Sequence, residues 1–364
     1  MKIRPATTED NLLICKLCEH AMPGHIQIAL ERNPNFFIGS MVQCENPEVY
    51  VCTNNEDTTI VGLFSIGSRR VWLDGTVKTI RYFSDLRLAE NVNRAQALFT
   101  VCNYINTHQI LHDTLAQTIV FDDNGRMKKV IELLNLRSEK HHIFRYFKHG
   151  VYRSYMLNIK NRQAETDKKC TVRKANQTDL QRIEDYIKKE ASKINFFPFY
   201  SIYDLSNAYH KGLSIDDFYI AEKDHEIIGL CAVWDQTPYK QTRVKSYSII
   251  LRLIRPLVNI VFKLTGGFVL PPPNKIIPYV SLHSILVKNH DADVLKVIVN
   301  KILVDLKDSE YKYILCGMAE SSPLQKIFGA YSNKRSIKGN CFLVSENKPE
   351  YIDSSEFYLE LGRI

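Results

Sequence analysis

The chain of 364 residues repeats one pattern twice, and an internal repeat restricts the possible folds more than any single motif does. Ile3-Arg4-Pro5-Ala6 followed by Asp10 recurs as Val172-Arg173-Lys174-Ala175 followed by Asp179, at an offset of 169 residues. Apolar segments farther along recur with nearly the same spacing, and the offset changes only where a turn between two predicted strands shortens. Matched spacing of this kind predicts two copies of one structural unit.

The two copies define the predicted domains. The first half is residues 1–159, and the second half is residues 170–364. The polar segment 160–169 has no apolar periodicity, which predicts a linker. The second half also contains a basic amphipathic insertion at about 238–275.

Each half shows the same order of predicted elements, in which apolar residues alternate in the strands and recur at helical spacing in the helices. In the first half we expect strands at 2–6, 48–54, 58–68, 79–88 and 117–121, and helices at 8–20, 94–107 and 125–134. In the second half we expect strands at 170–175, 217–222, 226–234, 278–287 and 311–317, and helices at 178–192, 291–306 and 322–331. A closing pair of strands is expected to complete each half. This order predicts a mixed α/β fold.

The element order resembles that of the GNAT superfamily of acyl-CoA-dependent N-acyltransferases. The opening Ile3-Arg4-Pro5-Ala6-Thr7 and the polar turn before Ile60-Val61-Gly62 add to the resemblance. It covers nearly the whole chain, twice, and implies two GNAT-like domains in tandem, each a splayed mixed sheet flanked by helices. The family resemblance also implies acetyl-CoA or another acyl-CoA as co-substrate, in a gap between the long central strand and the strand after it, without a metal.

The resemblance assigns the co-substrate segment to the first half. It implies that the backbone N–H groups of Leu86-Arg87-Leu88 lie where the two strands part, and that Arg94-Ala95-Gln96-Ala97 opens the following helix. A helix N-terminus offers unpaired N–H groups and a positive dipole end to a diphosphate. Asn124 corresponds to the asparagine that lies beside the pantetheine arm in the family.

The glycines of the family pattern are missing from both halves. Ala97 and Phe99 stand where the family has glycine. The second half reads Lys288-Asn289-His290-Asp291-Ala292-Asp293, in which two aspartates would repel a diphosphate. An acyl-CoA site is therefore expected in the first half, and the second half is expected to shape the substrate site or to serve as a structural partner.

Aminolysis of a thioester needs a base for the amine and a proton donor for the departing thiolate. Asp85, on the long strand, is the candidate base, acting through water, and Tyr82 is the candidate donor. Other roles are open for both residues: Asp85 as a solvated or ion-paired strand residue, and Tyr82 as a packed aromatic. A reaction controlled by positioning alone would need neither.

The segment 240–288 is the most unusual part of the chain, because no acidic residue occurs between Asp235 and Asp291. Its apolar residues recur at helical spacing with arginine and lysine between them, which predicts an amphipathic helix. Three roles are open. We expect its apolar face to pack against the other half; alternatively, its cations bind an acidic substrate or the 3′-phosphate of coenzyme A, or it rests on an anionic membrane.

Composition indicates the compartment. Nine cysteines, an odd number in mostly apolar contexts, suit a reducing environment. The amino terminus is charged from its second residue and lacks a secretory pattern, and charges and prolines interrupt the longest apolar stretch. These features predict a cytoplasmic protein.

Together, the patterns predict an N-acyltransferase that moves an acetyl or similar acyl group from coenzyme A to an amine of a small molecule or peptide. Nucleic acid is not an expected partner, because no binding module accompanies the basic segment. Peripheral membrane contact is possible but not favoured, and the chain is expected to be a monomer or homodimer. The alternative is a non-catalytic binding module that contacts an anionic partner or a membrane through 240–288. The missing glycines favour the binding module, whereas Arg94 and Asn124 favour the enzyme.

Overall fold

The computed structural model describes residues 1–22, 24–57, 59–89, 92–141, 144–161, 170–332, 335–350 and 356–364, without the side chains of Ala95 and of residues 137–141. Most of the predicted linker 160–169 lies outside the described residues. The domain boundaries therefore stay a prediction.

The described helices and strands follow the predicted order in both halves. Those of the first half are β1 (Lys2–Pro5), α1 (Asn11–Cys18), β2 (Ile26–Glu31), α2 (Phe36–Gln43), β3 (Glu45–Thr53), β4 (Ile60–Leu73), β5 (Thr76–Leu88), α3 (Arg94–Thr107), β6 (Ala116–Phe121), α4 (Gly125–His141) and β7 (Arg145–Asn158). Those of the second half are β8 (Thr171–Lys174), α5 (Leu180–Ala191), β9 (Phe218–Lys223), β10 (Glu226–Trp234), β11 (Gln241–Tyr247), α6 (Ile249–Thr265), β12 (Lys275–Ile276), β13 (Tyr279–Val287), α7 (Ala292–Asp305), β14 (Tyr313–Ala319), α8 (Gln325–Tyr331) and β15 (Ile337–Ser345).

The predicted mixed α/β class is confirmed, with some agreements and some differences in detail. The helix expected at 94–107 has the bounds of α3, and the helix expected inside the basic insertion is α6. β2, α2, β11 and β12 were not predicted. The expected closing pair of strands is a single strand in each half, β7 and β15, among the described residues.

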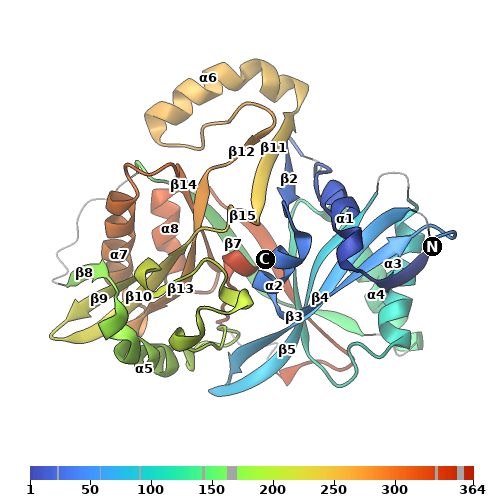
Figure 1. The fold of residues 1–364 in the computed structure, drawn as a ribbon, viewed down its shortest axis with the longest axis horizontal. Coiled ribbons are helices and arrows are strands. Elements are labelled where there is room, and N and C mark those ends of the chain that lie inside the picture. Colours follow the sequence, from blue (N-terminus) through green and yellow to red (C-terminus); the bar gives the residue numbers. More distant parts are fainter. Residues whose placement is uncertain are drawn as a thin grey trace.

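One mixed sheet of twelve strands runs through the whole molecule, in the order β1-β3-β4-β5-β6-β15-β7-β14-β13-β10-β9-β8 (Figure 1). Each strand that the first half contributes to this sheet has a counterpart at the mirrored place in the order, from β1 and β8 at the edges to β6 and β14 near the centre. The sheet is thus two similar halves joined at their closing strands.

The closing strands are exchanged between the halves. β7 pairs antiparallel with β14, from Asn158 opposite Tyr313 to Tyr152 opposite Ala319. β15 pairs antiparallel with β6, and the two exchanged strands pair with each other along the centre of the sheet. Each half therefore completes its sheet with a strand from the other half.

The sequence repeat has a structural reason. In the first half the guanidinium of Arg4 donates to both carboxylate oxygens of Asp10, at 2.8 and 3.0 Å. In the second half Arg173 donates to both oxygens of Asp179, at 2.7 and 2.8 Å. Each carboxylate also accepts a backbone N–H from the turn before the helix, so the repeated Arg and Asp fix the first strand to the first helix.

Replacing Asp179 with alanine should lower the free energy of unfolding by about 2 kcal/mol, because charged hydrogen bonds to a buried group are lost. Asp179 is 2% exposed, and its bonds to Arg173 help to hold its pKa below the ordinary value. Urea denaturation measures the change. Asp185→Ala, at an exposed position of α5, is the matched control and should change stability by less than about 0.5 kcal/mol. Equal effects of the two substitutions would contradict this role of Asp179.

A second, smaller sheet connects the halves on the side of the molecule that carries α6. It contains β12, β11 and β2, in that order, so a strand of the first half pairs with the insertion of the second half. Figure 1 shows α6 above this sheet, at the top of the molecule and outside the main layers.

Candidate active site

The candidate site of the first half lies where β5 leaves β6. Parallel pairing between the two strands covers only Arg81 with Ala116 and Tyr82 with Gln117. On its other edge β5 continues to pair with β4, with an irregularity at Asp85, whose φ of 54° is left-handed. The segment Leu86–Leu88 therefore follows a bulge, on an edge that β6 no longer covers, and Leu86 is 39% exposed.

α3 begins beyond the end of β5. Arg94 and Gln96 are exposed in its first turn, and the side chain of Asn93 caps the backbone N–H of Gln96 at 3.2 Å. Ala97 is 2% exposed and Phe99 is 54% exposed, so the residues that replace the family glycines point to the core and to solvent respectively. The side chain of Ala95 lies outside the described part of the chain.

Asn124 lies at the start of α4, the helix that follows β6. Its side-chain oxygen accepts the backbone N–H of Met127 at 3.1 Å, which makes it an N-cap. Because β5 and β6 are parallel, their carboxyl ends meet at the same edge of the sheet, and the first turns of α3 and α4 follow from that edge. The structure thus brings the predicted co-substrate residues to the end of the sheet where the carboxyl ends of β5 and β6 lie.

Asp85, the predicted base, is one half of a buried ion pair. Nη2 of Arg32 lies 3.0 and 3.2 Å from its carboxylate oxygens, and the two side chains are 4% and 7% exposed. Burial alone would raise the pKa of Asp85, but attraction to Arg32, Arg87 and Lys240 outweighs it and lowers the pKa below the ordinary 3.8. A carboxylate with a lowered pKa is a weak proton acceptor. Its role as base stays a prediction.

Tyr82, the predicted proton donor, lies in the core. Its side chain is 1% exposed, and the guanidinium carbon of Arg69 lies 3.3 Å from the ring centroid. Burial raises the pKa of Tyr82, so its hydroxyl holds its proton at neutral pH. This environment matches the packed-aromatic alternative, and the donor role stays a prediction.

The equivalent place in the second half is filled. β13 has its own left-handed residue, Ser284, with a φ of 53° beside a register shift, so it is the counterpart of Asp85. The Ser284 N–H donates to Glu360 at 2.8 Å, and the Ile285 N–H donates to the hydroxyl of Tyr358 at 3.2 Å. The C-terminal segment 356–364 thus accepts the backbone N–H groups of the bulge in the second half.

The N-terminus of α7 is also less suited to bind a diphosphate than that of α3. The carboxylate of its N-cap, Asp291, accepts the backbone N–H groups of Asp293 and Val294 at 3.1 and 3.2 Å. Two backbone donors of α7 are therefore used by a carboxylate, beside a second carboxylate on Asp293, whereas the neutral Asn93 side chain uses one donor of α3. These contacts give a physical basis to the expectation that the motif of the second half is degenerate.

Sequence reasoning missed the partners of Asp85. Arg32 follows β2, and the alternation Ile26, Ile28, Leu30 could have predicted that strand. Lys240 precedes β11, and its side-chain nitrogen donates to main-chain oxygens of Gly362 and Ile364 at 2.8 and 2.7 Å. No local pattern links either residue to Asp85.

A buried polar cluster behind the second bulge was also missed. His283 Nδ1 lies 2.7 Å from the hydroxyl of Ser284, which also contacts the hydroxyl of Tyr200. His283 Nε2 lies 3.3 Å from Nη2 of Arg363, a side chain that is fully buried. Arg363 also donates to main-chain oxygens of both halves, so this cluster anchors the C-terminal segment between them.

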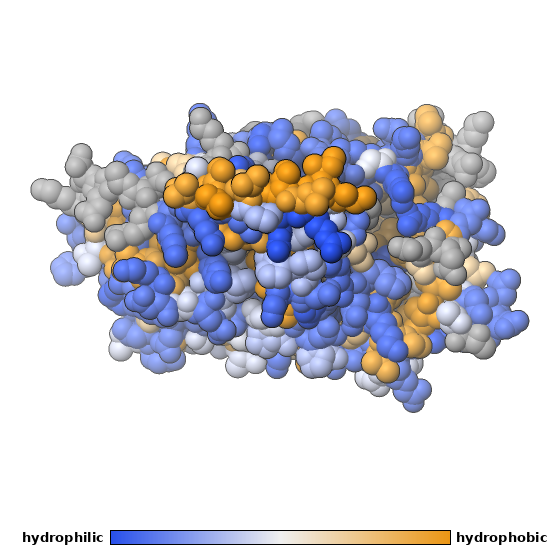
Figure 2. All heavy atoms as spheres, turned by 90° about the horizontal axis from the view of Figure 1, so that it is seen from above, coloured by the Kyte–Doolittle hydropathy of each residue, from blue (hydrophilic) through white to orange (hydrophobic). Residues whose placement is uncertain are grey.

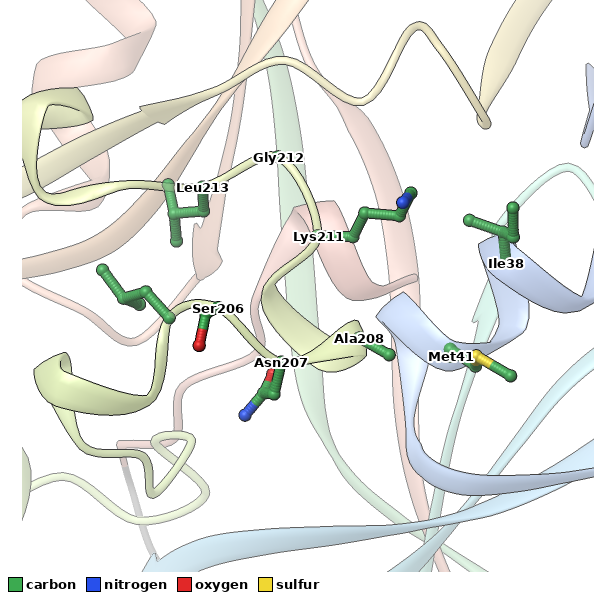
Figure 3. A pocket seen from close by; sticks show the side chains of 9 residues that line it. Ile38, Met41, Ser206, Asn207, Ala208, Lys211, Gly212 and Leu213 are labelled. Carbon is green, nitrogen blue, oxygen red and sulfur yellow. The ribbon is translucent and has the colours of Figure 1, made fainter.

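A surface cavity of about 370 Å³ lies between α2 and the loop that carries residues 205–213 (Figure 3). Ile38 and Met41 form one side, and Ser206, Asn207 and Lys211 contribute polar groups on the other. None of the predicted site residues lines it. The cavity is therefore separate from the opening beside β5.

Comparisons with known proteins give similarity in structure alone. No protein-family model matches the sequence, and no curated protein matches it significantly. The N-myristoyltransferase of Saccharomyces cerevisiae, solved with bound myristoyl-CoA and inhibitors, superposes with a TM-score of 0.59 at 8% identity, over 96% of this chain and 80% of that one. Another structure of that enzyme with myristoyl-CoA gives a TM-score of 0.56 at 9% identity, over 99% and 85% of the two chains.

A GCN5-related glucosamine N-acetyltransferase region of a fungal multi-domain GH3 β-N-acetylglucosaminidase is similarly close. Its TM-score is 0.59 at 9% identity, over 94% of this chain and 38% of that one. The expected GNAT-like fold is thereby confirmed. At such low identity these likenesses show the fold and leave the chemistry to the residues of the site.

Proposed function

We propose that the chain is an acyl-CoA-dependent N-acyltransferase whose co-substrate site lies in the first half, along β5 and the start of α3. The observation that carries the proposal is the bulged end of β5, which parts from β6 after two residue pairs and leads to an exposed helix start. The likeness of the fold to an N-myristoyltransferase solved with myristoyl-CoA supports it. The filled bulge of the second half favours the first half as the site.

The residues beside the opening suit the parts of an acyl-CoA. Arg94 and the N-terminal N–H groups of α3 would bind the diphosphate, with Gln96 exposed in the same turn. Backbone N–H groups of Leu86–Leu88 would donate to the thioester carbonyl oxygen and stabilise the charge that develops there. Asn124 would position the pantetheine arm from the start of α4.

The bound acyl-CoA would supply the thioester that an amine attacks. In that reaction the C–S bond breaks, the new C–N bond forms, and the proton lost by the amine balances the thiolate. Asp85 and Tyr82 are the proposed base and donor, although the ion pair with Arg32 and the burial of Tyr82 favour positioning roles for both. Acetyl or a similar acyl group is the proposed group transferred, and an amine of a small molecule or peptide is the proposed acceptor.

Calorimetric titration tests the site. Acetyl-CoA or myristoyl-CoA should bind the wild-type chain, and Arg94→Glu should weaken binding at least about tenfold, because a carboxylate replaces the cation that faces the diphosphate. Lys288→Glu, four residues before the start of α7 in the second half, is the control for added negative charge and should bind as wild type does. No heat with either thioester, or equal losses in both variants, would contradict the proposed site.

Activity separates the enzyme from the non-catalytic binding module. Free thiol should appear when the protein, its thioester and an amine such as glucosamine or a short peptide are combined. Thioester binding without thiol release on any amine in a broad panel would favour the binding module instead.

A further inference from the structure

Helix α6 presents a continuous apolar surface to solvent. Its eight outward side chains, here named the α6 ridge, are 42–82% exposed: Ile249, Ile250, Leu253, Ile254, Leu257, Ile260, Val261 and Leu264. No residue of α6 is buried. The expectation that the apolar face packs against the other half is therefore wrong for these eight side chains. Figure 2 looks down on this side of the molecule and shows the hydrophobic band that α6 forms there.

The ridge is regular because the sequence keeps one arc of the helix free of polar residues. At 100° per residue its eight side chains fall within an arc of about 140°. Leu251, Val258 and Phe262 lie on the opposite side and pack on a cluster that includes Val244 and Leu270. Ile26, Ile28 and Met156 of the first half pack on the same cluster, so this inner face meets the other half as expected. α6 thus has two apolar faces, and only the narrower one is covered by the protein.

Specific contacts hold the helix in this orientation. Ser248 caps its start, and Gly266, with a φ of 67°, ends it in the left-handed region. The side chain of Asn259 accepts the N–H of Leu270 at 2.7 Å and donates to its carbonyl oxygen at 3.0 Å. Arg255 donates to the carbonyl oxygen of Pro271 at 2.9 Å. The ridge is therefore a fixed surface and not a frayed segment.

Cations without acidic partners border the ridge. Arg252 and Lys263 are exposed on the helical flank next to it, and Lys275 is exposed on β12. Within the described ranges, which include every residue from 170 to 332, none of these three cations forms an ion pair. Two other basic residues of the segment, Arg243 and Lys245, form ion pairs with Glu31, and Lys245 also lies 3.9 Å from Glu19. The uncompensated charge is thus concentrated beside the exposed apolar face.

We propose that α6 docks the protein on an anionic membrane surface, with the ridge in the outer acyl-chain region and Arg252 and Lys263 at the lipid phosphates. An apolar arc flanked by cations is the pattern of a helix that lies in the plane of the interface. No helix in the described residues has the length and apolarity needed to cross a bilayer. The inference does not depend on the acyltransferase proposal.

Charge distinguishes a membrane from a second copy of the chain. Two ridges packed on each other would bring like cations together, and the sequence from 236 to 290 contains no acid that could pair with them. An anionic lipid surface supplies the missing negative charge. The observations therefore favour lipid over self-association.

Vesicle sedimentation tests the docking. The full chain should bind vesicles of phosphatidylcholine with roughly a third phosphatidylserine, and partitioning should fall at least about tenfold for Leu257→Asp, because a charge enters the apolar face. Leu257 is 67% exposed, so the substitution leaves the core intact. Leu136→Asp, at a 73% exposed position of α4, is the matched control and should bind as wild type does. A thermal melt confirms that each variant is folded.

A charge variant and a change of lipid complete the test. Arg252→Glu with Lys263→Glu should weaken binding to anionic vesicles, and pure phosphatidylcholine should bind the wild-type chain weakly. The proposal is overturned if neutral and anionic vesicles bind alike, or if Leu257→Asp binds as wild type does. It is also overturned if light scattering shows a dimer that Leu257→Asp dissociates while neither protein binds vesicles.

Discussion

Replacing Arg32 with methionine should lower the free energy of unfolding by about 3–5 kcal/mol, because the substitution leaves the carboxylate of Asp85 buried without its closest cation. Nη2 of Arg32 makes both contacts to Asp85, and the two side chains are 4% and 7% exposed. Asp85→Asn should be costly as well, since Arg32, Arg87 and Lys240 then face one another without the charge that they share. Urea denaturation measures both changes.

A double-mutant cycle isolates the pair. Asparagine tolerates the left-handed backbone at position 85, so the variant tests the charge and not the bulge. The double variant, Arg32→Met with Asp85→Asn, should be more stable than the sum of the single effects implies. Arg70→Met removes an exposed ion pair with Glu45 and should cost at most about 1 kcal/mol. Additive effects at positions 32 and 85 would exclude a coupled pair.

Glu360→Gln should make the protein more stable at pH 8 and leave it nearly unchanged at pH 5. Burial raises the pKa of Glu360 to about 7 from an ordinary value of 4.5. Between these pH values the folded protein holds a proton that the unfolded chain releases, so the contribution of Glu360 falls as pH rises from 4.5 and is lost above 7. The difference between wild type and variant should grow by about 3 kcal/mol across this window.

The comparison must be made within each pH, because other buried groups titrate in the opposite direction. Burial lowers the pKa of His210 to about 2 and lowers that of His283, so the unfolded chain takes up protons on histidine as pH falls below 6.5. Wild type and Glu360→Gln share that effect of the histidines, so it cancels in the difference between their free energies of unfolding. Glu346→Gln, at an exposed position, should show no pH-dependent difference from wild type. A constant gap between Glu360→Gln and wild type from pH 5 to pH 8 would exclude a raised pKa at Glu360.

The order of helices and strands could be predicted because it depends on local sequence patterns. α3 and the hairpin of β9 and β10 follow from apolar periodicity and turn residues alone. The repeat was visible because both copies keep the Arg and Asp of one ion pair. β2 also carries a local signal, an alternation in Ile26–Glu31 that was overlooked.

The contents of the site could not be predicted in the same way. Arg32 and Asp85 are 53 residues apart, and Ser284 meets Glu360 across 76 residues. Contacts over such separations produce no periodic pattern in the sequence, because they depend on the order of the strands in the sheet. The family pattern assigns the predicted site to the end of β5, but it could not show that an arginine neutralises the aspartate there.

The surroundings of α6 illustrate the same limit. An amphipathic pattern gives the width of an apolar face, but it does not say whether protein, lipid or water covers that face. Packing against the other half was expected, and it is found for the narrow face, which shares a cluster of Val244 and Leu270 with Ile26 and Ile28 of the first half, but not for the wider face. Only the three-dimensional arrangement shows that the wider face is free.

The exchange of β7 and β15 has a consequence for biosynthesis. The neighbour that β6 needs, β15, leaves the ribosome more than 200 residues after β6 does, because Val344 pairs with Ala116. The amino-terminal half therefore cannot complete its sheet while the chain is being made. The edge of β6 that pairs with β15 stays unpaired until β15 has been synthesised. A chain arrested before position 337 should keep that edge unpaired and recruit chaperones or aggregate, whereas the finished chain buries it.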